Sequence, residues 1–132
     1  MAGQKVIVDA SVVIKWFAEE SGSDRALQLR DQHKDGTLRI VVPELLFLEV
    51  LNGLRNKGAQ KTMLQKANRE LWELQLQTVP LTVSLVEKAG ITALEYQLTV
   101  YDALYWCVAV LHGAPLITED KLLLRLPNAE RL

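Results

Sequence analysis

Short apolar runs that alternate with longer amphipathic segments give the chain its pattern. The first run, residues 6–8, is β-branched throughout and is typical of a strand buried on both faces of a parallel sheet. Comparable runs follow at residues 38–42, 78–79 and 114–118, and residues 128–132 are a candidate edge strand. The pattern therefore predicts five short strands spread along the whole chain.

Between these runs, apolar residues recur at helical spacing. Gly36 suits the left-handed cap that ends a helix, and Pro43 suits the first position of the next one. Thr82 or Ser84 opens a later helix, and Thr99 is the expected cap of the helix after it. The predicted helices cover residues 12–17, 24–35, 43–57, 60–75, 82–96, 100–112 and 121–126. Strands that alternate with helices predict one α/β domain over residues 1–132, with a parallel sheet flanked by helices on both faces.

Composition narrows the class of protein. The chain has 132 residues, enough for one domain with a real core. A net charge of −1 argues against coating nucleic acid through bulk charge, but it leaves room for a nuclease in which metal ions act locally. The single Cys107 cannot form an internal disulfide, and no leader or membrane-length apolar segment is visible. A cytoplasmic protein is expected.

Two acids stand where apolar strands end. Asp9 follows the first strand and Asp120 follows the run at 114–118, and a helix is predicted after each. The carboxyl ends of parallel strands share one edge of a sheet, which is where ligands bind in open α/β folds. The two carboxylates are therefore expected to be neighbours. A plain helix cap is the alternative for Asp9, because Asp and Ser are both good caps.

Two further acids lie on predicted helices. Glu49 is the only charged residue between Glu44 and Arg55, and Glu is rarely buried without a partner. The alternative is that Glu49 sits at the edge of the apolar stripe and reaches water. Asp102 is a candidate with a strong competing role, since it occupies the third position of the helix that Thr99 caps.

Considered together, the four acids indicate a cation site. Carboxylates that converge without Lys or Arg among them repel one another unless a cation compensates. Ligation by oxygen alone is what Mg²⁺ or Mn²⁺ prefers. Such a site can activate water and stabilise charge on a phosphoryl group.

Four segments resemble the motif series of PIN-domain ribonucleases, in order and with suitable spacing over the whole chain. The similarity is greatest to the toxins of VapBC-type toxin–antitoxin pairs. The segments are Val6-Ile7-Val8-Asp9-Ala10-Ser11, Pro43-Glu44-Leu45-Leu46-Phe47-Leu48-Glu49-Val50, Tyr101-Asp102-Ala103-Leu104-Tyr105 and Leu116-Ile117-Thr118-Glu119-Asp120-Lys121.

The resemblance implies a five-stranded parallel sheet and a divalent metal, Mg²⁺ or Mn²⁺, bound by Asp9, Glu49, Asp102 and Asp120. It implies an endoribonuclease that cleaves RNA and is held inactive by a small antitoxin, one of whose basic side chains would neutralise the acid site. Ser11 and Thr118 match the hydroxyl positions of the family, where they would orient carboxylates or water. Glu119 departs from the family pattern, which often has Ala there, and so adds an acid beside the site.

Basic and apolar residues supply weaker predictions about partners. Lys15, Lys121 and Arg125 follow the strand-end acids and are the candidate substrate contacts. The apolar helices carry more large side chains than one small sheet needs, and a homodimer with a groove for the apolar helix of an antitoxin is expected. The large side chains in question are Trp16, Phe47, Leu48, Leu51 and Trp72.

Two other classes of protein compete with the nuclease. A catalytically silent PIN-like module would bind RNA or protein without cutting it, and the presence of all four acids argues against it. A different α/β enzyme is the second. A haloacid-dehalogenase-like phosphatase would need a second Asp at position 11, where this chain has Ser, and a dinucleotide-binding domain would need a Gly-rich turn after the first strand.

Overall fold

A computed structural model of the chain describes residues 3–132. Its centre is a five-stranded sheet in which every pairing is parallel and the strand order is β3-β2-β1-β4-β5. The strands are β1 (Gln4–Val8), β2 (Leu38–Pro43), β3 (Gln77–Val79), β4 (Leu116–Thr118) and β5 (Ala129–Arg131). The predicted sheet is confirmed, including the short strand at the edge near the C-terminus.

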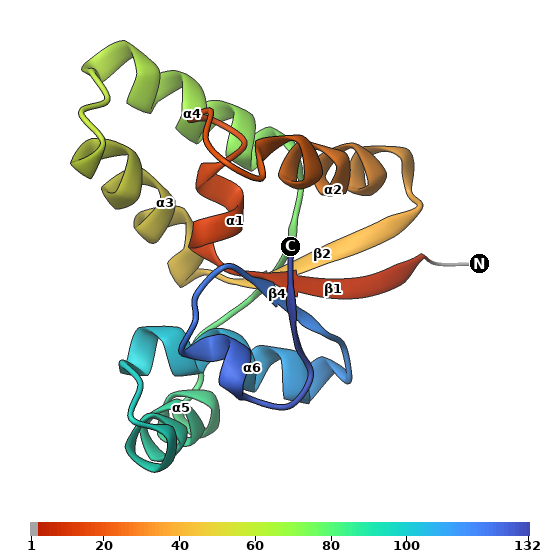
Figure 1. Cartoon of the computed structure of the whole chain (residues 1–132), viewed down its shortest axis with the longest axis vertical. Helices are drawn as coiled ribbons and strands as arrows, with labels where there is room; N and C mark the ends of the chain where they lie inside the picture. Colours follow the sequence, from red (N-terminus) through yellow and green to blue (C-terminus); the bar gives the residue numbers. More distant parts are fainter. Residues whose placement is uncertain (1–2) are drawn as a thin grey trace.

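Helices cover both faces of this sheet, as predicted (Figure 1). On one face lie α1 (Ala10–Ile14), α2 (Ser23–Asp35), α3 (Leu45–Asn56) and α4 (Lys61–Glu73). On the other lie α5 (Val83–Tyr96) and α6 (Val100–His112), which pack against each other. No helix within residues 3–132 is long and apolar enough to cross a membrane.

The core forms where the two helical layers meet the central strands. Ile7 and Val8 of β1 and residues 40–42 of β2 are fully buried, as expected of central parallel strands that have helices on both sides. Leu46, Val50 and Leu54 of α3 recur every four residues and face this core. The apolar runs that predicted the strands are therefore the residues that hold the layers together.

Capping residues set several helix boundaries as the sequence predicts. Thr82, rather than Ser84, caps α5, since its hydroxyl accepts a hydrogen bond from the Leu85 N–H at 3.1 Å. Thr99 caps α6 in the same way through the Asp102 N–H, also at 3.1 Å. Gly36 ends α2 with a φ of 83°, a left-handed conformation that favours glycine.

Three predicted helices differ from those observed. The first, predicted over residues 12–17, is α1 at Ala10–Ile14, so that Trp16 and Phe17 lie in the turn after it. Pro43 is the last residue of β2, paired in register with Val79, and α3 begins only at Leu45. The predicted helix at residues 121–126 is a single 3₁₀ turn, η1 (Leu123–Arg125). The following Pro127 disfavours helical geometry at the residue before it, and Leu126 is accordingly extended, with ψ at 150°.

The order of the strands creates a topological switch point at the carboxyl edge of the sheet, between β1 and β4. From β1 the chain adds β2 and β3 on one side, and it then returns to place β4 and β5 on the other side of β1. The crevice beyond the carboxyl ends of β1 and β4 is the topological switch point, the position where open α/β sheets bind ligands. Asp9 directly follows β1, and Asp120 follows β4 by two residues.

Candidate functional site

Asp9 connects the two strands that flank the switch point. Its Oδ1 accepts hydrogen bonds from the Ser11 hydroxyl at 2.5 Å and from the Val12 N–H at 3.4 Å, so it also caps α1. Its Oδ2 accepts from the Thr118 hydroxyl of β4 at 2.5 Å. Only Oδ1 of Asp9 therefore acts as a helix cap, because Oδ2 accepts its hydrogen bond from Thr118, which is far away in the sequence.

Burial makes this carboxylate unusual. Asp9 is only 5% exposed, and loss of hydration raises its pKa even though three hydrogen bonds favour the charged form. The charge of Asp120 adds to that increase. No ion pair within residues 3–132 includes Asp9. A buried carboxylate in this position is at its most stable when something positive joins it.

Glu49 extends from α3 toward the same place. Its Oε1 accepts a hydrogen bond from the Tyr105 hydroxyl at 2.6 Å. The side chain is partly buried, and desolvation raises its pKa, with the charges of Asp102 and Asp9 contributing. Glu49 therefore lies among other acids instead of pointing into free solvent at the edge of the apolar stripe.

Asp102 and Asp120 complete the group from two further elements. Asp102, in the first turn of α6, is partly buried, and its pKa is raised by that burial and by the charge of Asp120. Asp120 donates its backbone N–H to the Thr118 hydroxyl at 2.9 Å and accepts from the backbone N–H groups of Leu122 and Leu123 at 2.8 and 3.2 Å. One of its two carboxylate oxygens is thereby fixed at the start of η1.

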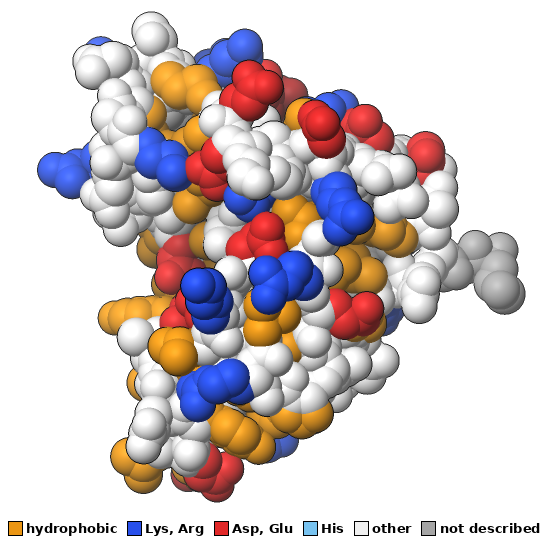
Figure 2. All heavy atoms as spheres, in the orientation of Figure 1, with side chains coloured by type: hydrophobic (Ala, Val, Ile, Leu, Met, Phe, Trp, Pro, Cys, Tyr) orange, Lys and Arg blue, Asp and Glu red, His pale blue; other side chains and the backbone are white. Residues whose placement is uncertain are grey.

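The four acids lie within reach of one another's charge. Asp9 interacts unfavourably with Asp120, Asp120 with Asp102, Asp102 with Glu49, and Glu49 with Asp9. The fold thus brings four carboxylates from four different segments to the carboxyl edge of the sheet. Figure 2 shows acidic side chains, in red, within the hollow at the left of the molecule, between the two helical layers.

The donor set fits a hard divalent cation. Every ligand on offer is a carboxylate or hydroxyl oxygen, and the three ion pairs found in the described part of the chain involve other acids. Within residues 3–132 no three His, Cys, Asp or Glu side chains stand close enough together to hold a metal ion as they are arranged here. Mg²⁺ commonly retains several waters and takes only a few carboxylates, so an open cluster of this kind is compatible with it.

The two predicted hydroxyl groups lie between the acids. The Thr118 hydroxyl donates to Asp9 and accepts from the Asp120 backbone, so it joins the two strand-end acids. The Ser11 hydroxyl donates to the other oxygen of Asp9 and accepts from the Glu119 N–H at 3.3 Å. Both are placed to fix the orientation of the Asp9 carboxylate.

Sequence reasoning gave Tyr105 no role, although it belongs to the site. It is 1% exposed, and its pKa is raised well above the ordinary range by burial and by the neighbouring charge of Glu49. The sequence feature that could have indicated a role for Tyr105 is its spacing from Asp102. Tyr105 follows Asp102 by three residues and so lies on the same face of α6.

Two of the three basic candidates for substrate contact are engaged elsewhere. Lys15 is 8% exposed, and its ammonium donates to the Ser21 carbonyl at 2.6 Å and to Glu20 at 3.1 Å. The guanidinium of Arg125 donates to the Tyr96 carbonyl at 2.8 Å and so ties η1 to the end of α5. Lys121 is exposed beside Asp120.

The carboxylate of Glu119 lies near Gly22, although its backbone N–H donates to the Ser11 hydroxyl. Its Oε1 lies 3.5 Å from the position that a Cβ on Gly22 would take, next to the segment that leads into α2. The side chain of Glu119, which follows β4, therefore lies beside the loop between α1 and α2.

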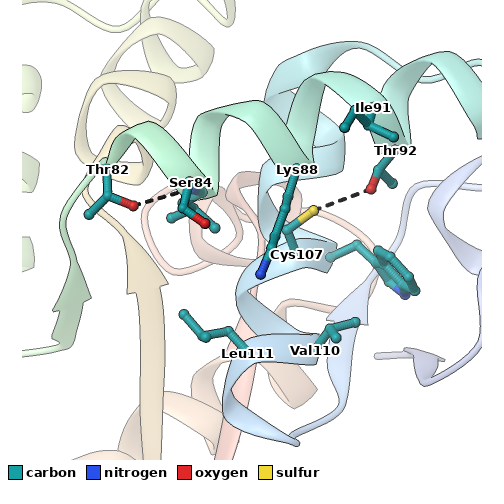
Figure 3. Close-up of a pocket in the computed structure, with 10 residues that line it drawn as sticks. Thr82, Ser84, Lys88, Ile91, Thr92, Cys107, Val110 and Leu111 are labelled. Carbon is teal, nitrogen blue, oxygen red and sulfur yellow. Dashed lines mark hydrogen bonds between the residues drawn. The ribbon is translucent and has the colours of Figure 1, made fainter.

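An apolar groove between α5 and α6 is separate from the acids (Figure 3). It has a volume of about 280 Å³, and within it the Thr92 hydroxyl and the Cys107 sulfur are 3.5 Å apart. Its walls include Ile91, Val110 and Leu111. None of the four carboxylates lines this groove.

Comparisons with known proteins bear on the family and on the fold. A family model described as the PIN domain matches residues 6–129. The chain is similar to the ribonuclease VapC3 of Pyrobaculum aerophilum, at 30% identity over 122 residues, 89% of this chain and 90% of that protein. Among solved structures, a toxin–antitoxin complex from Klebsiella pneumoniae has a TM-score of 0.72 at 19% identity and 95% coverage of both chains. VapC20 of Mycobacterium tuberculosis, a Sarcin-Ricin loop cleaving toxin, has a TM-score of 0.73 at 15% identity, covering 91% of this chain and 93% of that chain.

Proposed function

The chain belongs to the PIN-domain family, and from that premise we propose that it is a metal-dependent endoribonuclease, the toxin of a VapBC-type toxin–antitoxin pair. The observation that carries the proposal is the group of four carboxylates at the switch point, which repel one another and have no cationic side chain paired with them among residues 3–132. A protein does not assemble such a group for stability, because each acid would be more stable with a counter-charge.

The acids and the hydroxyl groups of the site have different roles. Asp9, Glu49, Asp102 and Asp120 would hold Mg²⁺ or Mn²⁺, which when bound supplies Lewis acidity that activates water and neutralises charge on the phosphate. Ser11 and Thr118 keep Asp9 in one orientation through hydrogen bonds to both of its oxygens. Because the four acids come from separate elements, the packing of the layers fixes their spacing in advance of substrate binding.

A silent PIN-like binding module is the second candidate, and a test for metal-dependent cleavage separates the two. Purified protein with single-stranded or looped RNA should produce cleavage when Mg²⁺ or Mn²⁺ is present and none when a chelator is present. A binding module would leave the RNA intact in both samples. Equal cleavage in both samples would contradict the role of the metal.

We propose that the partners of the protein are RNA and an antitoxin. We also propose that the protein acts in the cytoplasm. Lys121, exposed next to Asp120, is the best-placed of the three candidate substrate contacts, since Lys15 and Arg125 already have hydrogen-bond acceptors. A basic side chain of the antitoxin, inserted among the four acids, would supply the positive charge that the protein lacks there.

The homodimer proposal rests on a different set of side chains from those named by sequence reasoning. Trp16 and Phe47 are each 7% exposed and belong to the core, so they cannot form part of the predicted surface, whereas Leu48 and Trp72 are exposed at 70% and 57%. Helix α5 instead has two apolar faces. One packs on α6, and the other exposes Val83 at 90%, Val86 at 46% and Leu94 at 84%, together with the charged Glu87. A helix that is apolar on both faces is typically covered on both, and we propose that a second copy of the chain covers the outer face.

Replacing Leu94 by Glu should convert a dimer into a monomer at micromolar concentration, because a charge would then be buried in the apolar contact. Light scattering of parent and variant checks this. Leu111→Glu, on the wall of the α5–α6 groove, is the matched control and should remain dimeric. A parent protein that is monomeric throughout the micromolar range would contradict the proposed dimer. A dimeric Leu94→Glu variant would show that the interface does not include the outer face of α5.

A further inference from the structure

Tyr105 has a fully buried hydroxyl group whose hydrogen-bond partner is an acid of the site. The phenol oxygen donates to Oε1 of Glu49 at 2.6 Å, between residues 56 positions apart in sequence. Within residues 3–132 this is the one side-chain hydrogen bond that reaches Glu49, and it leaves Oε2 without a protein partner. The two oxygens of the same carboxylate are therefore in different situations.

The hydrogen bond between Tyr105 and Glu49 does more than satisfy a buried hydroxyl group. A buried phenol needs one acceptor, and a backbone carbonyl would provide it without placing a charge in the interior. The acceptor here is instead a partly buried carboxylate that is repelled by Asp102 and Asp9. Without Tyr105, repulsion would favour conformers of Glu49 that turn away from those acids, since its side chain has several rotatable bonds.

We propose that Tyr105 is a positioning residue that holds Glu49 in the acid cluster, so that Oε2 stays available to a divalent cation. The inference rests on the proposed function and deepens it. Asp102 and Tyr105 lie one helical turn apart on α6, so the same helix supplies one acid and fixes a second that comes from α3. Partners of this kind, which orient a ligand without touching the metal, typically contribute about 10- to 100-fold to metal affinity.

Removal of the hydroxyl tests the proposal. Tyr105→Phe keeps the buried ring, and we expect it to bind Mn²⁺ about tenfold or more weakly than the parent, measured by calorimetric titration of the metal alone. Tyr96→Phe is the matched control. Tyr96 lies on α5 with its ring against Trp106, and its hydroxyl has no hydrogen-bond partner in the described part of the chain, so its Mn²⁺ affinity should match the parent.

The results separate a positioning role from a structural one. If Tyr105→Phe melts at a lower temperature but binds Mn²⁺ as tightly as the parent, the hydroxyl serves only the fold and the proposal is overturned. Should Tyr105→Phe be too unstable to fold, the titrations of the parent and both variants are repeated in an osmolyte such as sucrose, which favours the folded state. In the Glu49→Gln background, Tyr105→Phe should cause no further loss of Mn²⁺ affinity. A parent that binds no Mn²⁺ would contradict the proposed function itself, which is a different result from an unchanged Tyr105→Phe.

Discussion

Asp9→Asn should reduce RNA cleavage by at least ~10²-fold, more than the loss expected when a partner outside the ligand set is removed. The amide keeps the size of the side chain but not its charge, and Asp9 is the most buried of the four acids. The variant should still fold. Asn is as good a helix cap as Asp, and its NH2 group can donate to the Thr118 hydroxyl in place of the bond that Asp9 accepts. Loss of a charge that burial disfavours offsets the rest.

Cleavage rates with Mg²⁺, together with melting curves of both proteins, check this prediction. Asp24→Asn is the matched control, since Asp24 is an exposed acid in the first turn of α2 and should leave the rate unchanged. If folded Asp9→Asn retained half or more of the parent's rate, Asp9 would be a helix cap and the proposed site would lose its central residue.

The second large effect is expected at Glu49, an acid with no capping role. Glu49→Gln removes the charge but keeps an oxygen that can accept from Tyr105. Mn²⁺ should raise the melting temperature of the parent, because a ligand of the folded state stabilises it. The variant should show much less of this rise and little RNA cleavage.

The metal-free proteins should differ in the opposite direction. The pKa of Glu49 is higher in the folded chain than in the unfolded one, so the folded state binds more protons in the interval between the two values. The stability of the parent in chelator therefore falls as pH rises above the usual Glu pKa of about 4.3, and Gln avoids that loss. Glu49→Gln should melt no lower than the parent near neutral pH, with an advantage that disappears on acidification.

Melting curves with chelator and with Mn²⁺, at several pH values, measure both effects. Glu70→Gln on the exposed side of α4 is the control and should behave as the parent. A Glu49→Gln protein with full cleavage and a full response to Mn²⁺ would place Glu49 outside the site.

The fold could be predicted because its strongest signals are local. Residues 6–8 and 38–42 are apolar runs that only a sheet covered on both faces can bury, and they form the two central strands. The meeting of Asp9 and Asp120 also followed from a general rule, since parallel strands bring their carboxyl ends to one edge. The predicted pairing of strand-end acids needed no knowledge of side-chain packing.

What could not be predicted depends on contacts between distant segments. The hydrogen bond from Tyr105 to Glu49 requires the register of α6 against α3, which no local pattern specifies. The position of Lys15 in the sequence predicted a substrate contact. In the structure the loop after α1 folds back, and the Lys15 ammonium donates hydrogen bonds to Glu20 and Ser21 of that loop. The exposure of Leu94 likewise depends on which face of α5 meets α6, because both faces are apolar.

The chemistry at the cleaved bond tests the account most directly. Asp9, Glu49, Asp102 and Asp120 would hold a metal that activates water; attack of that water on the phosphate, with the 3′-oxygen as the leaving group, would leave a 5′-phosphate on the downstream fragment. RNA cut by the purified protein with Mg²⁺ should therefore carry 5′-phosphate ends, which a 5′-phosphate-dependent exonuclease or ligation assay detects. Fragments with 5′-hydroxyl ends and 2′,3′-cyclic phosphates would mean that the RNA's own 2′-hydroxyl is the nucleophile, and would contradict a metal-activated water held by these four acids.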